Sequence, residues 1–146
     1  MRITRFTDYS LRVLIYLAGQ EEGHLSTIQE IADSYAISKN HLMKVVHQLN
    51  QKGYIVTVRG KNGGMRLHHK PQSINIGALV RETEEELNIV ECLSRGNTCK
   101  ITPVCGLRGM FGEALQAFLA VLDKYTLADV VQSKHRPELL RLLHVV

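Results

Sequence analysis

The sequence predicts a mainly α-helical protein with one small β-hairpin, built as a winged helix-turn-helix followed by a long helix towards the C-terminal end. Two observations carry this prediction. Two short amphipathic helical segments joined by a tight turn precede a strand–turn–strand pattern. Further along the chain, apolar residues keep helical period for longer than one small domain needs to bury a helix.

The composition is that of a globular chain of 146 residues, with 45% apolar and 22% charged residues and a net charge of +4. No apolar run is long enough to span a bilayer, so we expect no membrane partner. Asp8 and Arg12 interrupt the apolar part of the N-terminal segment, which therefore does not resemble a signal peptide. We expect a cytoplasmic protein, whose thiols stay reduced.

The first helix is predicted over residues 4–17, with apolar residues on two faces, as expected for a helix that contacts two neighbours. The segment 21–24 ends it. Ser26 and Gln29 have the spacing of a capping box and predict the start of the next short helix.

A second short helix is predicted to open at Ser38 and to end at Gly53. Its buried stripe consists of Leu42, Val45, Val46 and Leu49. Polar side chains in its first turns lie off that stripe; they are Lys39, Asn40, His41 and Lys44. In a helix-turn-helix, this is the surface of the second helix that enters the major groove of DNA.

The following segment alternates apolar and polar residues over 54–59, turns at Asn62-Gly63, and resumes the alternation at Met65. Candidate DNA contacts at this hairpin tip are Arg59, Lys61, Asn62 and Arg66. Each of these residues alone is equally compatible with a solvated turn. The ordered set of helix, turn, helix and basic hairpin favours a winged helix that binds double-stranded DNA.

The second half of the chain is predicted to begin with a short helix over residues 76–85, followed by a solvated acidic cluster. Thr102-Pro103 predicts the start of a long helix whose apolar period continues to Tyr125. Its apolar surface exceeds what one winged helix covers, so we expect this helix to join two copies of the chain as a homodimer. A last short helix is predicted to start at Thr126.

All three cysteines of the chain, Cys92, Cys99 and Cys105, follow the short helix predicted over residues 76–85. Their spacing is Cys-x6-Cys-x5-Cys. A structural zinc site normally has closer pairs and four ligands, whereas wider spacing suits a loop around an iron–sulfur cluster. The spacing alone also allows a zinc site or redox-active thiols. The fourth ligand is also open, the candidates being Asp8, His24, His41 and His47.

The segments FTDYSLRVLIYLA, SKNHLMKVVHQL, VRGKNGGMRL, ITPVC and DKYTLADVV, together with the three cysteines, resemble the NsrR-like, nitric-oxide-sensing repressors of the Rrf2 superfamily. The resemblance implies a homodimer with a cluster in each subunit, bound by Cys92, Cys99 and Cys105 and by Asp8 of the partner subunit. It implies a [4Fe-4S] cluster, with [2Fe-2S] as the alternative. IscR-like relatives use a histidine shortly after the last cysteine, where this chain has Gly106-Leu107-Arg108.

The expected function is therefore that of a transcriptional repressor that binds palindromic operator DNA as a dimer and is released when nitric oxide nitrosylates its cluster. The alternatives are an IscR-like regulator of cluster supply and a thiol- or zinc-based redox sensor. The chain lacks nucleotide-binding glycine loops and nucleophile motifs, so we expect no enzyme. We expect residues 1–75 to bind DNA and residues 76–146 to hold the cluster and the dimer interface.

Overall fold

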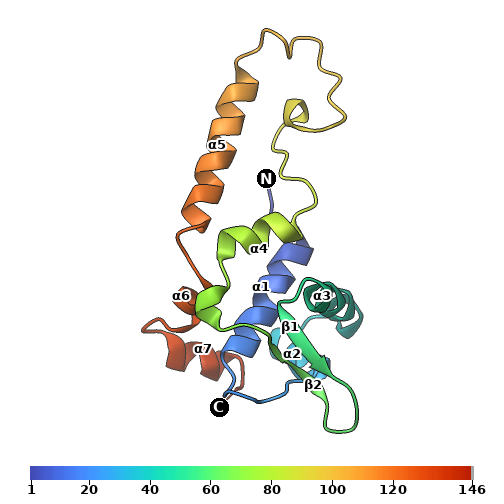
Figure 1. Cartoon of the computed structure of the whole chain (residues 1–146), viewed down its shortest axis with the longest axis vertical. Coiled ribbons are helices and arrows are strands. Elements are labelled where there is room, and N and C mark those ends of the chain that lie inside the picture. Colours follow the sequence, from blue (N-terminus) through green and yellow to red (C-terminus); the bar gives the residue numbers. More distant parts are fainter. Residues whose placement is uncertain (146) are drawn as a thin grey trace.

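A computed structural model describes residues 1–145 and shows a helical head from which one long helix and an irregular loop extend as an arm (Figure 1). The elements in chain order are α1 (Arg5–Ala18), α2 (Ile28–Tyr35), α3 (Lys39–Gln51), β1 (Ile55–Val58), β2 (Gly64–Leu67), the 3-10 turn η1 (Pro71–Ser73), α4 (Ile76–Thr83), the 3-10 turn η2 (Glu91–Leu93), α5 (Leu107–Leu122), α6 (Leu127–Val131) and α7 (Arg136–Leu142).

Helix α1 lies at the centre of the head, as its two apolar faces predicted. The Thr4 side chain caps its first turn by accepting a hydrogen bond from the Thr7 N–H at 3.3 Å. Val13 and Leu14 are fully buried in the main core. The helix packs on α3 and β2 and also on α4 and α6, so it connects the helix-turn-helix and its hairpin to the second half of the chain.

Helix α2 starts one residue later than the sequence predicted. Thr27 is the N-cap and Glu30 completes the capping box, in place of Ser26 and Gln29. Ser26 is instead buried in a short antiparallel bridge with Met65 of β2, where the two backbones exchange hydrogen bonds of 2.9 and 2.8 Å. Pairing with the hairpin therefore takes Ser26 out of the helix.

Helix α3 follows after a turn in which Ala36 adopts a left-handed conformation with φ of 53°. Ser38 caps the helix, as predicted, and Leu42, Val45, Val46 and Leu49 form its buried face. Strands β1 and β2 pair antiparallel with Val56 opposite Arg66, which confirms the predicted hairpin and with it the winged helix-turn-helix.

The C-terminal elements return to the head. Leu127 of α6 and Leu143 after α7 belong to the same core as α1 and α3, and Leu79 joins them from α4. The Asp129 carboxylate accepts hydrogen bonds from the Thr126 N–H and hydroxyl, so α6 begins where the sequence predicted. Residues on both sides of position 75 thus share one core.

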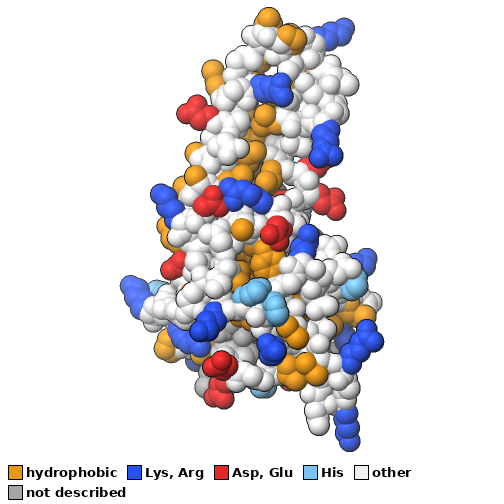
Figure 2. All heavy atoms as spheres, in the orientation of Figure 1, with side chains coloured by type: hydrophobic (Ala, Val, Ile, Leu, Met, Phe, Trp, Pro, Cys, Tyr) orange, Lys and Arg blue, Asp and Glu red, His pale blue; other side chains and the backbone are white. Residues whose placement is uncertain are grey.

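Helix α5 forms the arm and begins at Leu107, four residues later than Pro103 predicted. The Thr102 hydroxyl donates to the Cys99 carbonyl at 2.9 Å instead of capping the turns that follow. Within Leu107–Leu122, every residue of which is described, Leu119 alone is buried. The helix is shorter than expected, but its apolar surface is uncovered in the single chain, as Figure 2 shows by the hydrophobic side chains along the arm.

A buried hydroxyl pair ties the start of α1 to the end of α4. The Thr7 hydroxyl donates to the Thr83 hydroxyl at 2.9 Å, and the Thr83 hydroxyl donates to the Leu79 carbonyl at 2.8 Å. Thr7 is 0% and Thr83 3% exposed, so water cannot replace either partner.

Thr83→Val is therefore expected to lower the free energy of unfolding by about 1–3 kcal/mol, because the Thr7 hydroxyl loses its acceptor in a dry environment. Chemical denaturation of the purified protein measures this change. Thr57→Val, at an exposed position of β1, is the matched control. A Thr83→Val loss no larger than that of Thr57→Val would contradict the assigned role of the hydroxyl pair.

Candidate metal centre and nucleic-acid interface

The three cysteines lie on the loop that links α4 to α5, at the far end of the arm from the head. Cys92 is in η2, Cys99 is on the exposed loop, and Cys105 precedes the first turn of α5. All three line one hollow of about 170 Å³, whose other walls are mainly apolar and include Ile101 and Phe111. Residues far apart in this loop are therefore gathered around one space.

The donor set fits an iron–sulfur cluster. Thiolates are its usual ligands, and an apolar wall around the sulfurs limits access of water to the iron. Three free thiols face a hollow of this kind here. Among residues 1–145, no group of three or more His, Cys, Asp or Glu side chains is close enough to hold a single metal ion.

Polar side chains that the sequence reasoning did not single out hold the loop in shape. The Glu91 carboxylate accepts hydrogen bonds from the Thr98 N–H at 3.1 Å and from its hydroxyl at 2.9 Å. These two bonds lower the pKa of Glu91, so the carboxylate remains ionised as the acceptor. Because Glu91 precedes Cys92 and Thr98 precedes Cys99, this link brings two of the cysteines towards each other.

A second link surrounds Cys99. The Asn97 amide accepts a hydrogen bond from the Cys99 N–H at 3.0 Å and donates one to the Thr102 hydroxyl at 2.9 Å. An asparagine side chain that bonds the backbone two residues on is a common turn device. The Asn-x-Cys spacing was therefore a readable signal for this turn.

Asp8 does not line the hollow of its own chain. It stands in the first turn of α1 with its side chain 46% exposed, and its carboxylate forms a bidentate pair with Arg12 at 3.0 and 3.2 Å. Arg12 also lies over the ring of Tyr9, with its guanidinium carbon 5.5 Å from the ring centroid. The structure thus gathers the cysteines and leaves Asp8 on the surface of the head.

The start of α3 presents Lys39, Asn40 and Lys44 as exposed side chains. His41 differs from them, because it is half-buried and packs edge-on against Tyr9 at 4.7 Å between ring centroids. Of the four predicted contacts on α3, three therefore project freely, and the fourth contacts the residue next to Asp8.

The wing presents a second cationic surface. Arg59, Lys61 and Asn62 at its tip are exposed, as is Arg66, which donates to the Leu67 carbonyl at 3.2 Å. Gly63 is required in this turn because a Cβ there would lie 2.1 Å from the Val58 carbonyl oxygen. Lysine and arginine side chains project at the edge of the molecule where the hairpin ends (Figures 1 and 2).

In the part of the chain that the structure describes, none of the helices combines the length and the apolar character needed to cross a membrane.

Comparison with known families finds a match to the Rrf2 model, described as an iron-dependent transcriptional regulator, over residues 3–133. The chain is 58% identical over 135 residues to the HTH-type transcriptional regulator NsrR of Bacillus subtilis (strain 168), covering 92% of each chain. It is 51% identical, with the same coverage, to the HTH-type transcriptional regulator NsrR of Geobacillus kaustophilus (strain HTA426).

Solved structures of regulators share the fold. The global cysteine regulator CymR of B. subtilis superposes with a TM-score of 0.73 at 24% identity, covering 90% of this chain and 97% of CymR. The oxidized form of Staphylococcus aureus CymR gives a TM-score of 0.72 at 26% identity, covering 91% and 98%. T. potens IscR gives 0.72 at 21% identity, covering 90% and 87%.

Proposed function

Because the chain belongs to the Rrf2 family of iron-dependent transcriptional regulators, we propose that it is a homodimeric repressor in which an iron–sulfur cluster senses nitric oxide. The observation that carries the proposal is the convergence of Cys92, Cys99 and Cys105 on one hollow in a protein whose head is a winged helix-turn-helix. As a regulator of transcription, it would act on DNA in the cytoplasm and is no enzyme.

The proposed ligands are the three cysteine thiolates of one subunit and the carboxylate of Asp8 of the partner subunit. Asp8 lies on the head surface, away from its own cysteines, which supports a ligand supplied across an interface. A cluster of the [4Fe-4S] type held by these residues would supply iron that reacts with nitric oxide, and the carboxylate of Asp8 of the partner subunit would be a weaker ligand to it than the thiolates.

The residues around Asp8 support a route from this ligand to the DNA-reading surface. A ligating Asp8 carboxylate has to share or surrender its pair with Arg12. Its neighbour Tyr9 contacts both Arg12 and His41 of α3. Release of Asp8 would therefore change contacts at the first turn of the helix that is proposed to read the operator.

The uncovered apolar surface of α5 supports the dimer. Leu107, Met110 and Val121 are each about half exposed or more in the single chain. Exposed apolar surface on this scale marks a protein interface. We accordingly propose that residues 1–75 read DNA and that residues 76–146 supply cluster and dimer contacts, with α6 and α7 packing back on the head.

A gel shift with anaerobically purified protein tests the function. The holo-protein is expected to be brown, to retard a palindromic operator duplex selected from a random library, and to release it after stoichiometric nitric oxide. Unchanged retardation after nitric oxide would refute the proposed sensing. A colourless protein that contains zinc would instead favour a thiol- or zinc-based regulator.

The wing is expected to supply affinity through phosphate contacts. Replacing Arg59 and Lys61 together by alanine removes four such contacts from the proposed homodimer, two in each subunit. The slope of log K against log salt concentration is therefore expected to become shallower by about 3.6. Fluorescence anisotropy at several salt concentrations measures the slope. Lys134→Ala with Lys124→Ala removes the same charge away from α3 and the hairpin, and an equal change in that control would contradict the wing assignment.

A further inference from the structure

Helix α5 is joined to the head at a short segment near its C-terminal end. The backbone after α5 pairs with the segment before α4, where the Ile76 N–H donates to the Tyr125 carbonyl at 3.0 Å and the Leu127 N–H to the Ile74 carbonyl at 2.8 Å. Immediately beyond, α6 enters the main core through fully buried Leu127. The base of the arm is thus held by backbone pairing as well as by side chains.

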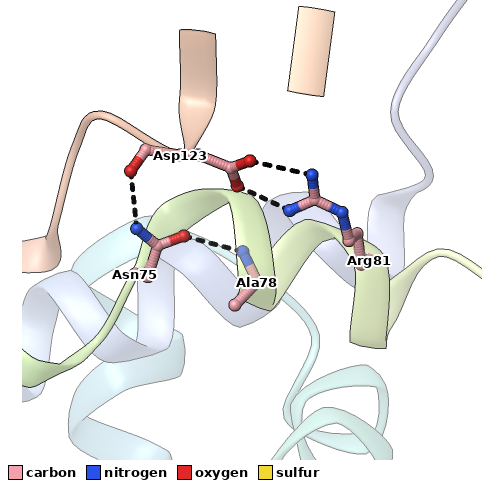
Figure 3. Close-up of polar contacts among 4 residues, drawn as sticks. All are labelled: Asn75, Ala78, Arg81 and Asp123. Atoms are coloured by element: carbon pink, nitrogen blue, oxygen red, sulfur yellow. Dashed lines mark hydrogen bonds and ion pairs between the residues drawn. The ribbon is translucent and has the colours of Figure 1, made fainter. Parts of the chain in front are cut away.

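Four residues hold the end of α5 against α4, and we call them the α4–α5 clamp: Asn75, Gly77, Arg81 and Asp123. Figure 3 shows the Asp123 carboxylate facing the Arg81 guanidinium, with nitrogen–oxygen distances of 2.5 and 2.9 Å. The pair lowers the pKa of the Asp123 carboxyl, which keeps it charged.

Asn75 serves both helices at once. Its side-chain oxygen caps α4 by accepting from the Ala78 N–H at 2.9 Å, and its amide nitrogen donates to the Asp123 carbonyl at 2.8 Å (Figure 3). Gly77 allows the close approach, because a Cβ there would lie 1.9 Å from an Asp123 carboxylate oxygen and 2.9 Å from its backbone nitrogen. Together with the apolar packing of Ile76 and Val80 on Leu119, these polar contacts set the direction of α5 relative to α4.

The opposite end of α5 lies beside η2 and the cysteine loop, away from the core of the head. With 16 residues, the helix is about 24 Å long at a rise of ~1.5 Å per residue. A change of about 5° at the clamp moves its far end by about 2 Å relative to the head. In a symmetric dimer joined through α5, both heads move equally. The distance between the two heads then changes by up to about 4 Å, which exceeds the ~3.4 Å between adjacent base pairs.

We propose that the α4–α5 clamp fixes the distance between the two α3 helices of the dimer, so that Asn75, Arg81 and Asp123 are positioning residues for the choice of operator half-site spacing. The inference rests on the proposed function, because it requires a dimer joined through α5 that reads a palindrome. The clamp touches neither the cysteine hollow nor the exposed DNA-reading residues of α3 and the wing. A substitution in the clamp would therefore change the orientation of the head relative to α5, and neither the cluster ligands nor the DNA contacts themselves.

The test uses the inverted repeat that the wild-type protein selects from a randomised duplex library, remade with its centre one base pair shorter and one base pair longer. Wild type is expected to bind the duplex with its selected spacing about tenfold or more tightly than the duplexes with the other two spacings. Arg81→Met, which leaves Asp123 accessible to water, and Asn75→Asp, which keeps the α4 cap, are expected to narrow this preference to about threefold or less. Arg141→Met, which breaks the exposed pair with Glu138 on α7, is expected to retain the full preference.

The outcomes separate the inference from its premise. If Arg81→Met and Asn75→Asp keep the wild-type ratio between spacings, even with uniformly weaker binding, the clamp is merely structural and the inference is overturned. A wild-type protein that distinguishes none of the three spacings would overturn the proposed dimeric readout itself, and the inference with it. Visible spectra of the variants, expected to equal that of wild type, verify that cluster binding is intact.

Discussion

Cys99→Ala is expected to abolish the visible absorption of the cluster and to lower operator affinity by about 1,000-fold or more, to the level of non-specific binding. Alanine removes one of the three cysteine thiols around the hollow. The loop itself should keep its turn, since the hydrogen bond from residue 99 to Asn97 uses the backbone N–H. Absorption spectra and anisotropy on the selected operator measure both losses.

Val104→Ala is the matched control, because Val104 lies in the same loop and its side chain is 87% exposed. It is expected to retain both the spectrum and the affinity. Cys99→Ala protein that keeps its colour and its affinity would rule out this cysteine as a ligand.

The same variant shows which subunit supplies the fourth ligand. A heterodimer of one Cys99→Ala chain and one Asp8→Ala chain has one complete ligand set only if Asp8 acts across the interface. Differently tagged chains, co-expressed and purified as the heterodimer, are then expected to carry about half the cluster of wild type, with wild-type resistance to chelators. If Asp8 served its own subunit, no complete set would remain. The one site that keeps its three cysteines would then lack its aspartate and be as sensitive to chelators as the sites of the Asp8→Ala homodimer.

Glutamate at both Met110 and Phe118 is expected to convert the dimer into monomers and to lower operator affinity by about 100-fold or more. The two side chains are 64% and 37% exposed in the single chain, so glutamates there are readily solvated in the monomer. In the dimer, two carboxylates from each chain would be buried without partners. Sedimentation velocity, together with anisotropy on the operator, measures the effect.

Gln132→Glu adds one negative charge per chain, against two in the double variant, at an exposed position after α6, outside α5, α3 and the wing. It is expected to leave the sedimentation coefficient and the affinity unchanged. A double glutamate variant that still sediments as a dimer would show that the interface lies elsewhere than on α5.

Much of the head was predictable from residues close together in the chain. The apolar stripe of α3, its Ser38 cap and the alternation around Asn62-Gly63 are local patterns, and the structure confirms each of them. The start of α2 was wrong by one residue because Ser26 pairs with Met65, which lies far along the chain. The start of α5 was wrong because the Thr102 hydroxyl bonds within the cysteine loop.

The features of the candidate site likewise separate into those predicted from local sequence and those that depend on tertiary contacts. The composition and spacing of the loop predicted the three cysteines as ligands, and the helical and strand patterns predicted the exposed cations of α3 and the wing. The bonds of Glu91 and Asn97 that shape the loop depend on which side chains meet after folding. The contact of His41 with Tyr9 likewise joins two helices, so no property of α3 alone predicts it.

By itself, the sequence determined a winged helix-turn-helix with a basic surface, a three-cysteine loop and an apolar helix too long for one small head. These follow from periodicity, capping and composition, which act within a few residues of each other. The tertiary structure alone decided that the thiols share one hollow, that Asp8 lies away from it, and that α5 leaves the head at an angle held by Arg81 and Asp123. Arg81 and Asp123 are 42 positions apart in the chain, and such pairs are chosen by the packing of whole elements, not by local preference.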